Sequence, residues 1–251
     1  MSISSTPTLQ PMLRKLSYWG ALGEADKAAA LALPFKQKLI EAQKYTVRDG
    51  DQATHSCVLL SGFAYRHKVV GDGSRQILSI NMKGDIVDLQ NSLLGTADHN
   101  VQALTQCEVA FIPRDEIRQI AFERPNIGMA MWYDTLVDGS IFREWIANVG
   151  RRDAHTRMAH LLCEFALRLK VAGLGERDNY VLPMTQEQLA DATGLTPVHV
   201  NRTLRALDEE GLISRDKREV RIADWKKLAA AGDFQSGYLH LHEDQTVTSE
   251  G

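Results

Sequence analysis

The sequence predicts an α+β protein: an N-terminal antiparallel β-roll or jelly roll, then a long helix, then a C-terminal winged helix-turn-helix. Three observations carry this prediction. Short alternating polar and apolar runs, separated by glycines, fill residues 35–112; a helical pattern covers about 126–149; and two capped helices with two short strands occupy 184–222. We expect five parts: a flexible N-terminus (1–22), the β-roll (23–125), the long helix (126–152), the winged helix-turn-helix (153–226) and a short helix with the C-terminal tail (227–251).

The first half of the chain predicts a flexible start, one short helix and a set of antiparallel strands. Pro7, Pro11 and weak periodicity indicate the flexible start, and an alanine-rich stretch before Pro34 predicts a helix over 24–33. Beyond residue 35, alternating polarity is typical of strands with one face buried. The pair Asp72-Gly73 between two such runs predicts a tight hairpin turn, because glycine adopts positive φ at little cost.

The long helix carries more apolar surface than a solvated helix tolerates. A second copy of the same helix is the simplest partner for that surface, so we expect this helix to form a homodimer. The alternative is burial against the protein's own β-roll. The candidate interface residues are Ile127, Met131, Ile141, Trp145 and Val149. A further helix over 154–171, capped by Asp153, follows it.

Residues 184–209 predict two helices joined by a sharp turn. Thr185 caps the first helix, and Gln188 three residues later completes a capping box. Gly194 lies at the turn, where a residue without Cβ is needed. Thr196 caps the second helix, and Pro197 occupies its first position, where a missing N–H costs nothing. This arrangement is typical of a helix-turn-helix.

The outward face of the second helix carries side chains suited to reading base pairs. Arg binds guanine with two hydrogen bonds, Asn binds adenine, and a Val methyl contacts thymine. Two short strands, 212–215 and 220–222, follow as a wing whose basic tip suits phosphates. The candidate DNA-contacting residues are Thr185, Thr196, Val198, His199, Asn201, Arg202, Arg205, Lys217 and Arg218. The alternative is an ordinary helical hairpin with a polar, solvated face.

Length, charge and cysteine content bound the function. The 251 residues contain no apolar run long enough to span a membrane, so we expect no membrane partner. No secretory signal is evident and the three cysteines fit no disulfide framework, which favours a cytoplasmic protein. A redox role for Cys57, Cys107 or Cys163 stays open. The formal net charge of −3 does not exclude DNA binding, because the clustering of basic groups decides it.

Two motifs resemble the Crp/Fnr family of bacterial transcription regulators: TQEQLADATGLTPVHVNRTLRALDEEGLI and GDGSRQILSINMKGDIVDL. The resemblance covers about residues 35–225. It implies a cyclic-nucleotide-type sensor fold for 23–125 and a dimerisation helix at 126–152. It also implies a homodimer that binds a palindromic site in double-stranded promoter DNA, with two recognition helices about 34 Å apart. RNA polymerase is a further expected partner if the protein is an activator.

The sensor segment departs from relatives that bind cyclic AMP. Those relatives grip the cyclic phosphate with an Arg followed by a small residue, and here Asp98 and His99 occupy that stretch. Because Asp98 repels a phosphate and His is mostly neutral at pH 7, we expect no cyclic AMP binding. The candidate sensor pocket consists of Asp85, Asp88, Leu89, His99 and Asn100. Many members of the family have a Glu in the recognition helix where this chain has Val198, so we expect a target sequence other than the usual one.

We expect neither a cofactor nor a metal, and no enzymatic activity. No cysteine precedes Cys57, which argues against the iron–sulfur cluster of oxygen-sensing relatives. The chain lacks a phosphate loop, a nucleophile elbow and paired metal ligands. Two alternatives stay open: a regulator without an effector that is controlled by its own synthesis, and a small-molecule-binding module whose helix-turn-helix contacts proteins.

Overall fold

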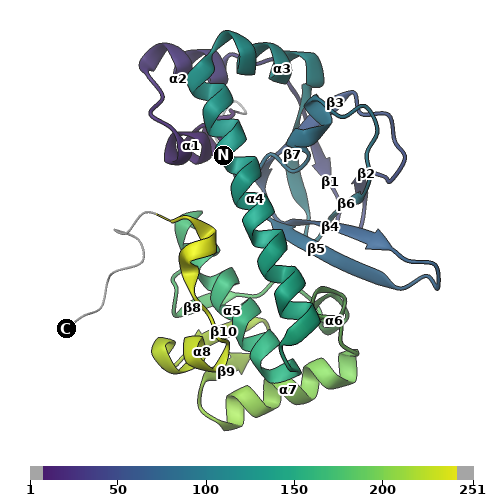
Figure 1. Ribbon diagram of the computed structural model, residues 1–251, viewed down its shortest axis with the longest axis vertical. Coiled ribbons are helices and arrows are strands. Elements are labelled where there is room, and N and C mark those ends of the chain that lie inside the picture. The colour runs from purple at the N-terminus through teal and green to yellow at the C-terminus, as the bar shows by residue number, and fades with distance from the viewer. Residues whose placement is uncertain (1–7, 242–251) are drawn as a thin grey trace, which may run out of the picture. The chain divides into compact units, whose positions relative to one another are not determined.

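The computed structural model describes residues 8–241 of the chain. The chain divides into two compact units: residues up to 69 together with 79–136, and residues 70–78 together with those from 137 onward. Figure 1 gives the labels of their helices and strands. The flexibility expected for residues 1–7, and the end of the tail beyond residue 241, lie outside the described residues.

Two antiparallel sheets form the β-roll, which confirms the predicted fold class. The three-stranded sheet has the order β1-β7-β3 and the four-stranded sheet has the order β2-β6-β4-β5. Their strands are β1 (Lys36–Ile40), β2 (Tyr45–Val47), β3 (His55–Ser61), β4 (Ala64–Val69), β5 (Arg75–Asn81), β6 (Asn100–Ala103) and β7 (Cys107–Pro113). The predicted turn after β4 is present: Asp72 Oδ1 accepts a 2.8 Å hydrogen bond from Ser74 N, and Gly73 has φ +86°. Local turn chemistry therefore sets the register of this hairpin.

The expectation of a flexible start is wrong for the described part of that segment. Helix α1 (Gln10–Trp19) buries Met12, Leu13 and Leu16 in the core of the first unit. These apolar residues recur at helical spacing, and Pro11 lies in the first turn, where it removes no helical hydrogen bond. The prolines were therefore compatible with a helix. A second helix, α2 (Glu24–Leu31), follows at the predicted place.

Three further elements complete the first unit and lead out of it. They are the 3-10 helix η1 (Leu89–Ser92), α3 (Arg114–Glu123) and α4 (Pro125–Arg151). At 1.5 Å per residue, the 27 residues of α4 extend over about 40 Å. Figure 1 shows α4 as one continuous helix. Within residues 8–241 no helix combines the length and the apolarity that crossing a membrane requires.

The second unit contains the predicted helix-turn-helix and wing. Its helices are α5 (Ala154–Val171), α6 (Gln186–Thr193), α7 (Pro197–Glu209), α8 (Trp225–Ala231) and the 3-10 helix η2 (Ser236–Leu239). The wing has three antiparallel strands in the order β8-β10-β9, formed by β8 (Asn179–Val181), β9 (Ile213–Asp216) and β10 (Glu219–Ile222). The sequence predicted only β9 and β10, because the three residues of β8 are too short to show an alternating pattern.

Candidate DNA-binding site

Local hydrogen bonds fix the helix-turn-helix as the sequence predicts. Thr185 Oγ1 accepts from Gln188 N at 3.2 Å, and Gln188 Oε1 accepts from Thr185 N at 2.9 Å, which closes the capping box. Gly194 ends α6 with φ +64°. Thr196 Oγ1 then accepts from His199 N at 3.2 Å and starts α7. Both helix starts and the turn between them are therefore set by residues within a few positions of one another.

Helix α7 has one buried and one exposed face. Its apolar face packs on α5 and α6. The buried residues are Val200, Thr203, Leu204 and Leu207. On the opposite side Val198 is 81% exposed, and Asn201, Arg202 and Arg205 are exposed at positions three, four and seven residues later. That spacing places the four side chains on one stripe of the helix, where they are available to a ligand.

Four basic side chains on this part of the molecule have no charge partner within residues 8–241. Arg202 and Arg205 on α7 make neither an ion pair nor a side-chain hydrogen bond, and both are exposed. Lys217 and Arg218 are exposed at the tip of the wing, where Lys217 adopts φ +53°. A fixed positive charge without an internal partner is suited to a phosphate or to a guanine edge.

Arg157 on α5 positions the turn end of α6, and the sequence reading missed it. Its guanidinium donates to three backbone carbonyls: Asn148 O at 3.0 Å, Arg152 O at 2.8 Å, and Thr193 O. One side chain therefore joins the end of α4 to the end of α6. A single basic residue in the first turn of a helix is too common for the sequence alone to reveal this role.

The two acidic residues of the candidate sensor pocket, Asp85 and Asp88, bind other groups inside the first unit. Asp85 Oδ1 lies 2.8 Å from Lys15 Nζ, and its other oxygen accepts from a backbone N–H. Asp88 is fully buried and Oδ1 accepts from Cys57 N at 2.6 Å. Burial raises the pKa of Asp88 to about 6, although the Cys57 N–H and the charge of Arg66 oppose the rise. These carboxyls are structural groups in this arrangement.

The other three sensor candidates have separate surroundings. His99 Nδ1 lies 2.7 Å from Asp98 Oδ1, and burial lowers the pKa of His99, so that the imidazole is neutral at pH 7. Asn100 Oδ1 accepts from the backbone N–H of Asp49 at 3.2 Å. Leu89 lines a groove beside α3 and α4. The space inside the roll, between Cys57, Val87 and neighbouring side chains, leaves no room for a water molecule. Each of the four polar candidates therefore has a partner inside the first unit.

The interface residues expected on α4 are buried or half-buried within the protomer. Ile127 is 0% exposed, Met131 4%, Ile141 6% and Trp145 7%, and Val149 is half-buried. The physical reason is that α4 has two apolar faces. The sequence reading selected the face that packs inside the protomer, where Trp145 Nε1 donates to Glu164 Oε2 at 2.9 Å.

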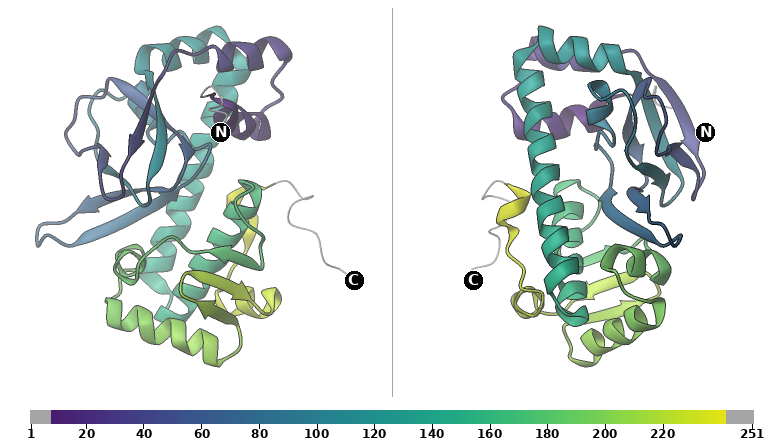
Figure 2. Two further views of the ribbon diagram at one scale, coloured as in Figure 1. Left: turned by 180° about the vertical axis from the view of Figure 1, so that it is seen from behind. Right: turned by 45° about the vertical axis from the view of Figure 1, so that its right-hand side comes forward.

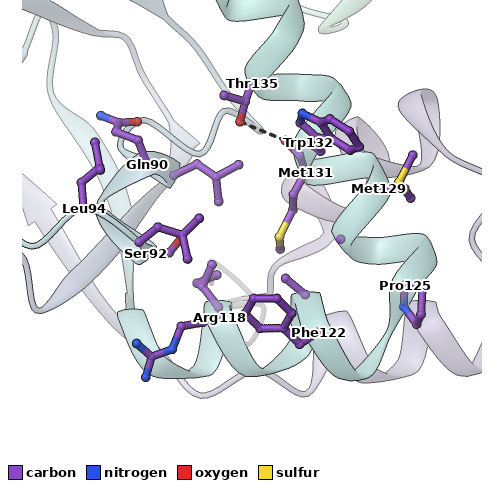
Figure 3. A pocket seen from close by; sticks show the side chains of 15 residues that line it. Gln90, Ser92, Leu94, Arg118, Phe122, Pro125, Met129, Met131, Trp132 and Thr135 are labelled. Atoms are coloured by element: carbon purple, nitrogen blue, oxygen red, sulfur yellow. Dashed lines mark hydrogen bonds between the residues drawn. The ribbon is translucent and has the colours of Figure 1, made fainter.

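The second apolar face of α4 is exposed. Met129 is 57% exposed, Trp132 60%, Leu136 55% and Ile146 72%. These positions are separated by three, four and ten residues, as in the seam of a coiled coil. Beside the start of this seam is an apolar groove of about 610 Å³ between η1, α3 and α4 (Figure 3). Its exposed lining includes Leu93, Leu94 and Phe122. We call the four α4 residues the outer seam.

Two domain families match the chain. Residues 37–124 match the cyclic nucleotide-binding domain, and residues 156–231 match the Crp-like helix-turn-helix domain. The first match contains the β-roll and α3, and the second contains α6, α7 and the wing. The candidate DNA-contacting residues all lie within the second matched segment.

Known transcription regulators are similar to this protein along most of the chain. The transcriptional activator protein FnrL of Cereibacter sphaeroides is 28% identical over 86% of this chain and 88% of its own. The nitrogen fixation regulation protein FixK of Bradyrhizobium diazoefficiens is 30% identical over 68% of this chain and 71% of its own. The solved structure of FixK2 from Bradyrhizobium japonicum has a TM-score of 0.73 at 20% identity and covers 79% of this chain and 98% of that one. The chain therefore belongs to the Crp/Fnr family of bacterial transcription regulators.

Proposed function

We propose that the protein is a homodimeric, sequence-specific regulator that binds a palindromic promoter site in the cytoplasm. The observation that supports this most directly is the exposed stripe of α7. Val198, Asn201, Arg202 and Arg205 lie together on it, and neither arginine has a partner within residues 8–241. An exposed stripe of this composition, on the second helix of a helix-turn-helix, is suited to the edges of bases in a major groove.

The contacts divide into readout and positioning. Arg202 is the proposed reader of a guanine, Asn201 of an adenine and Val198 of a thymine methyl, with His199 beside them. The hydroxyls of Thr185 and Thr196 also act as helix caps, so they contact the DNA backbone only in addition to that role. Lys217 and Arg218 on the wing tip contact phosphates and supply affinity without sequence preference. Base preference therefore belongs to α7 and general affinity to the wing.

The proposed partner of the outer seam is the outer seam of a second copy of the chain. Three features support this occupant. Met129, Trp132 and Leu136 follow coiled-coil spacing, their apolar side chains are exposed, and a groove lined by further apolar side chains begins beside them. A seam of this kind pairs with itself around a two-fold axis, which matches the symmetry of a palindromic site.

We propose further that the effector, if one exists, is not cyclic AMP. The space inside the β-roll beside Cys57 and Val87 leaves no room for a water molecule, and the segment where relatives place an Arg has the anionic Asp98 beside the neutral His99. A cyclic phosphate in this place would face a carboxylate instead of a guanidinium. The match to the cyclic nucleotide-binding domain family therefore supports the fold of the sensor and not its usual ligand.

Selection from a random duplex library tests the function directly. We expect the full-length protein to enrich a palindrome with half-sites one helical turn apart. Arg202→Ala should lose about 1–3 kcal/mol of preference for the cognate site over a scrambled site and relax selection at one base per half-site. Arg221→Ala is the matched control, because Arg221 pairs with Glu219 at 3.1 Å on the wing strand.

Absence of an enriched sequence at low salt would contradict the proposal and favour a protein-interaction module. Wild-type affinity of the Arg202→Ala variant for the cognate duplex, together with wild-type affinity for the scrambled duplex, would remove Arg202 from the readout. A thermal shift of several degrees with cyclic AMP would contradict the assignment of the sensor domain.

A further inference from the structure

We propose that residues 232–240 are a C-terminal strap that positions the DNA-reading domain on the long helix. The sequence suggested no role for this segment, which is polar and weakly periodic. In the structure it returns from α8 to α5 and to the last turns of α4 (Figure 2, yellow). This inference rests on the proposed function, because its consequence is the placement of α7 on a palindromic site.

The strap is joined to α5 at its beginning and near its end. His160 Nδ1 lies 3.1 Å from Gly232 O, and a Cβ on Gly232 would lie 2.6 Å from His160 N, so only glycine fits there. The ring of Tyr238 stacks on His160 at 5.9 Å between centroids and an interplanar angle of 15°. Tyr238 OH donates to Glu164 Oε2 at 2.8 Å. The segment therefore contacts about one turn of α5, from His160 to Glu164, with side-chain and backbone contacts.

The strap is also joined to the end of α4 and to the residues that follow it. Asp233 Oδ2 lies 3.1 Å from Arg152 Nη2, and Arg152 Nη1 lies 2.8 Å from Glu144 Oε1. At the other end of the strap, His240 Nε2 lies 3.2 Å from Ser140 Oγ. Leu239, between these polar contacts, is only 2% exposed. The strap is therefore fixed to α4 at Ser140 and to Arg152, the residue that follows the end of α4.

Glu164 connects the strap, α4 and α5 through one buried carboxylate. It is 1% exposed and accepts from Tyr238 OH at 2.8 Å and from Trp145 Nε1 at 2.9 Å. Arg168 Nη1 lies 3.3 Å away and supplies the opposite charge. Burying a carboxylate costs free energy unless hydrogen-bond donors surround it. Loss of one donor therefore destabilises the whole set of contacts around Glu164. The position of Trp145 on α4 thus depends on Tyr238 of the strap.

The strap crosses the joint between the two helices. Only Arg152 and Asp153 separate the end of α4 from the start of α5. A joint this short bends unless other contacts bridge it, and the strap bridges it at Ser140, Glu164 and Arg152. In a dimer joined through α4, the angle at this joint sets the separation of the two α7 helices. Tyr238 and Asp233 are therefore positioning residues for two-site binding.

The test compares affinity for a palindromic duplex with affinity for a duplex that keeps one half-site. Tyr238→Phe removes the hydroxyl and keeps the stacked ring, and Asp233→Ala removes the Arg152 contact at an exposed position. Gln235→Ala is the matched control, because Gln235 is exposed and its side chain caps nothing. We expect both strap variants to lower the ratio of palindromic to half-site affinity by about tenfold, with half-site affinity unchanged. The control should retain the wild-type ratio.

Amide hydrogen exchange of α4 over residues 137–151 gives a readout that does not depend on DNA. We expect faster exchange there in Tyr238→Phe than in wild type and the control. If both strap variants showed the wild-type exchange rate and the wild-type ratio of palindromic to half-site affinity, the proposed role of the strap would be overturned. An equal fall of both affinities would also overturn it, because that pattern reports loss of folding. If wild-type protein shows no palindrome preference, the proposed function fails, and the exchange data alone then decide whether the strap holds the joint.

Discussion

At the scale of single residues, Asp88 shows how burial changes the state of a side chain that the sequence marks only as acidic. The carboxyl is fully buried, and Oδ2 has no hydrogen-bond partner, while Oδ1 accepts from Cys57 N. Its charged form is therefore poorly solvated, and burial raises its pKa to about 6. Cys57 beside it is also buried, and burial and the Asp88 charge raise the pKa of its thiol, which disfavours a reactive thiolate there.

Asp88→Asn should therefore stabilise the protein in a pH-dependent way. Below pH 3.8 the carboxyl is protonated in both the folded and the unfolded state, so burial costs nothing. Between 3.8 and about 6 only the unfolded state ionises, so wild-type stability falls as pH rises, and the full cost of about 3 kcal/mol is present above pH 6. We expect the variant to gain about that amount at pH 7.5 and about half at pH 5, measured by chemical denaturation. An equal gain at both pH values would contradict a buried ionised carboxyl.

At the scale of elements, the features that could be predicted are those set by near neighbours in sequence. The capping box of Thr185 and Gln188, the turn at Gly194 and the hairpin at Asp72-Gly73 each depend on residues within four positions, and all are present. The orientation of α4 depends on what packs against it. The sequence shows apolar residues on two faces and does not say which face the protomer itself covers. The role of Arg157 and of the strap depends on contacts between distant segments, so the local pattern gives no sign of either.

The wing is an element whose effect on binding can be isolated by salt. Lys217→Ala should weaken binding to cognate and scrambled duplexes alike, and the slope of log affinity against log salt should fall by about 0.9. Arg221→Ala on strand β10 should leave the slope nearly unchanged, because Arg221 is already paired with Glu219. Fluorescence anisotropy titrations at four salt concentrations give the slopes. A loss confined to the cognate duplex would assign Lys217 to base readout instead.

At the scale of the whole molecule, the two faces of α4 have different tasks. Ile127, Met131 and Trp145 on the inner face are buried within the protomer, and we propose that the exposed outer seam pairs with a second chain. A single helix-turn-helix reads only a few base pairs, so pairing of two chains is what turns local recognition into selection of one promoter site. In our proposal the strap links these tasks, because its contacts hold each reader on its own long helix.

The central claim is that two chains, paired through the outer seam, bind one palindromic site. Sedimentation of the wild-type protein and of Leu136→Asp with a palindromic duplex tests this claim most directly. Leu136 is 55% exposed in the protomer, so the substitution is compatible with folding, but it places an unpaired charge in the seam of a dimer. We expect wild type and the control Leu136→Met to bind as two chains per duplex. Leu136→Asp should sediment as a monomer and lose at least about 100-fold in affinity for the palindrome, with half-site binding retained. Two Leu136→Asp chains on the duplex at wild-type affinity, or one wild-type chain per palindrome, would contradict the account.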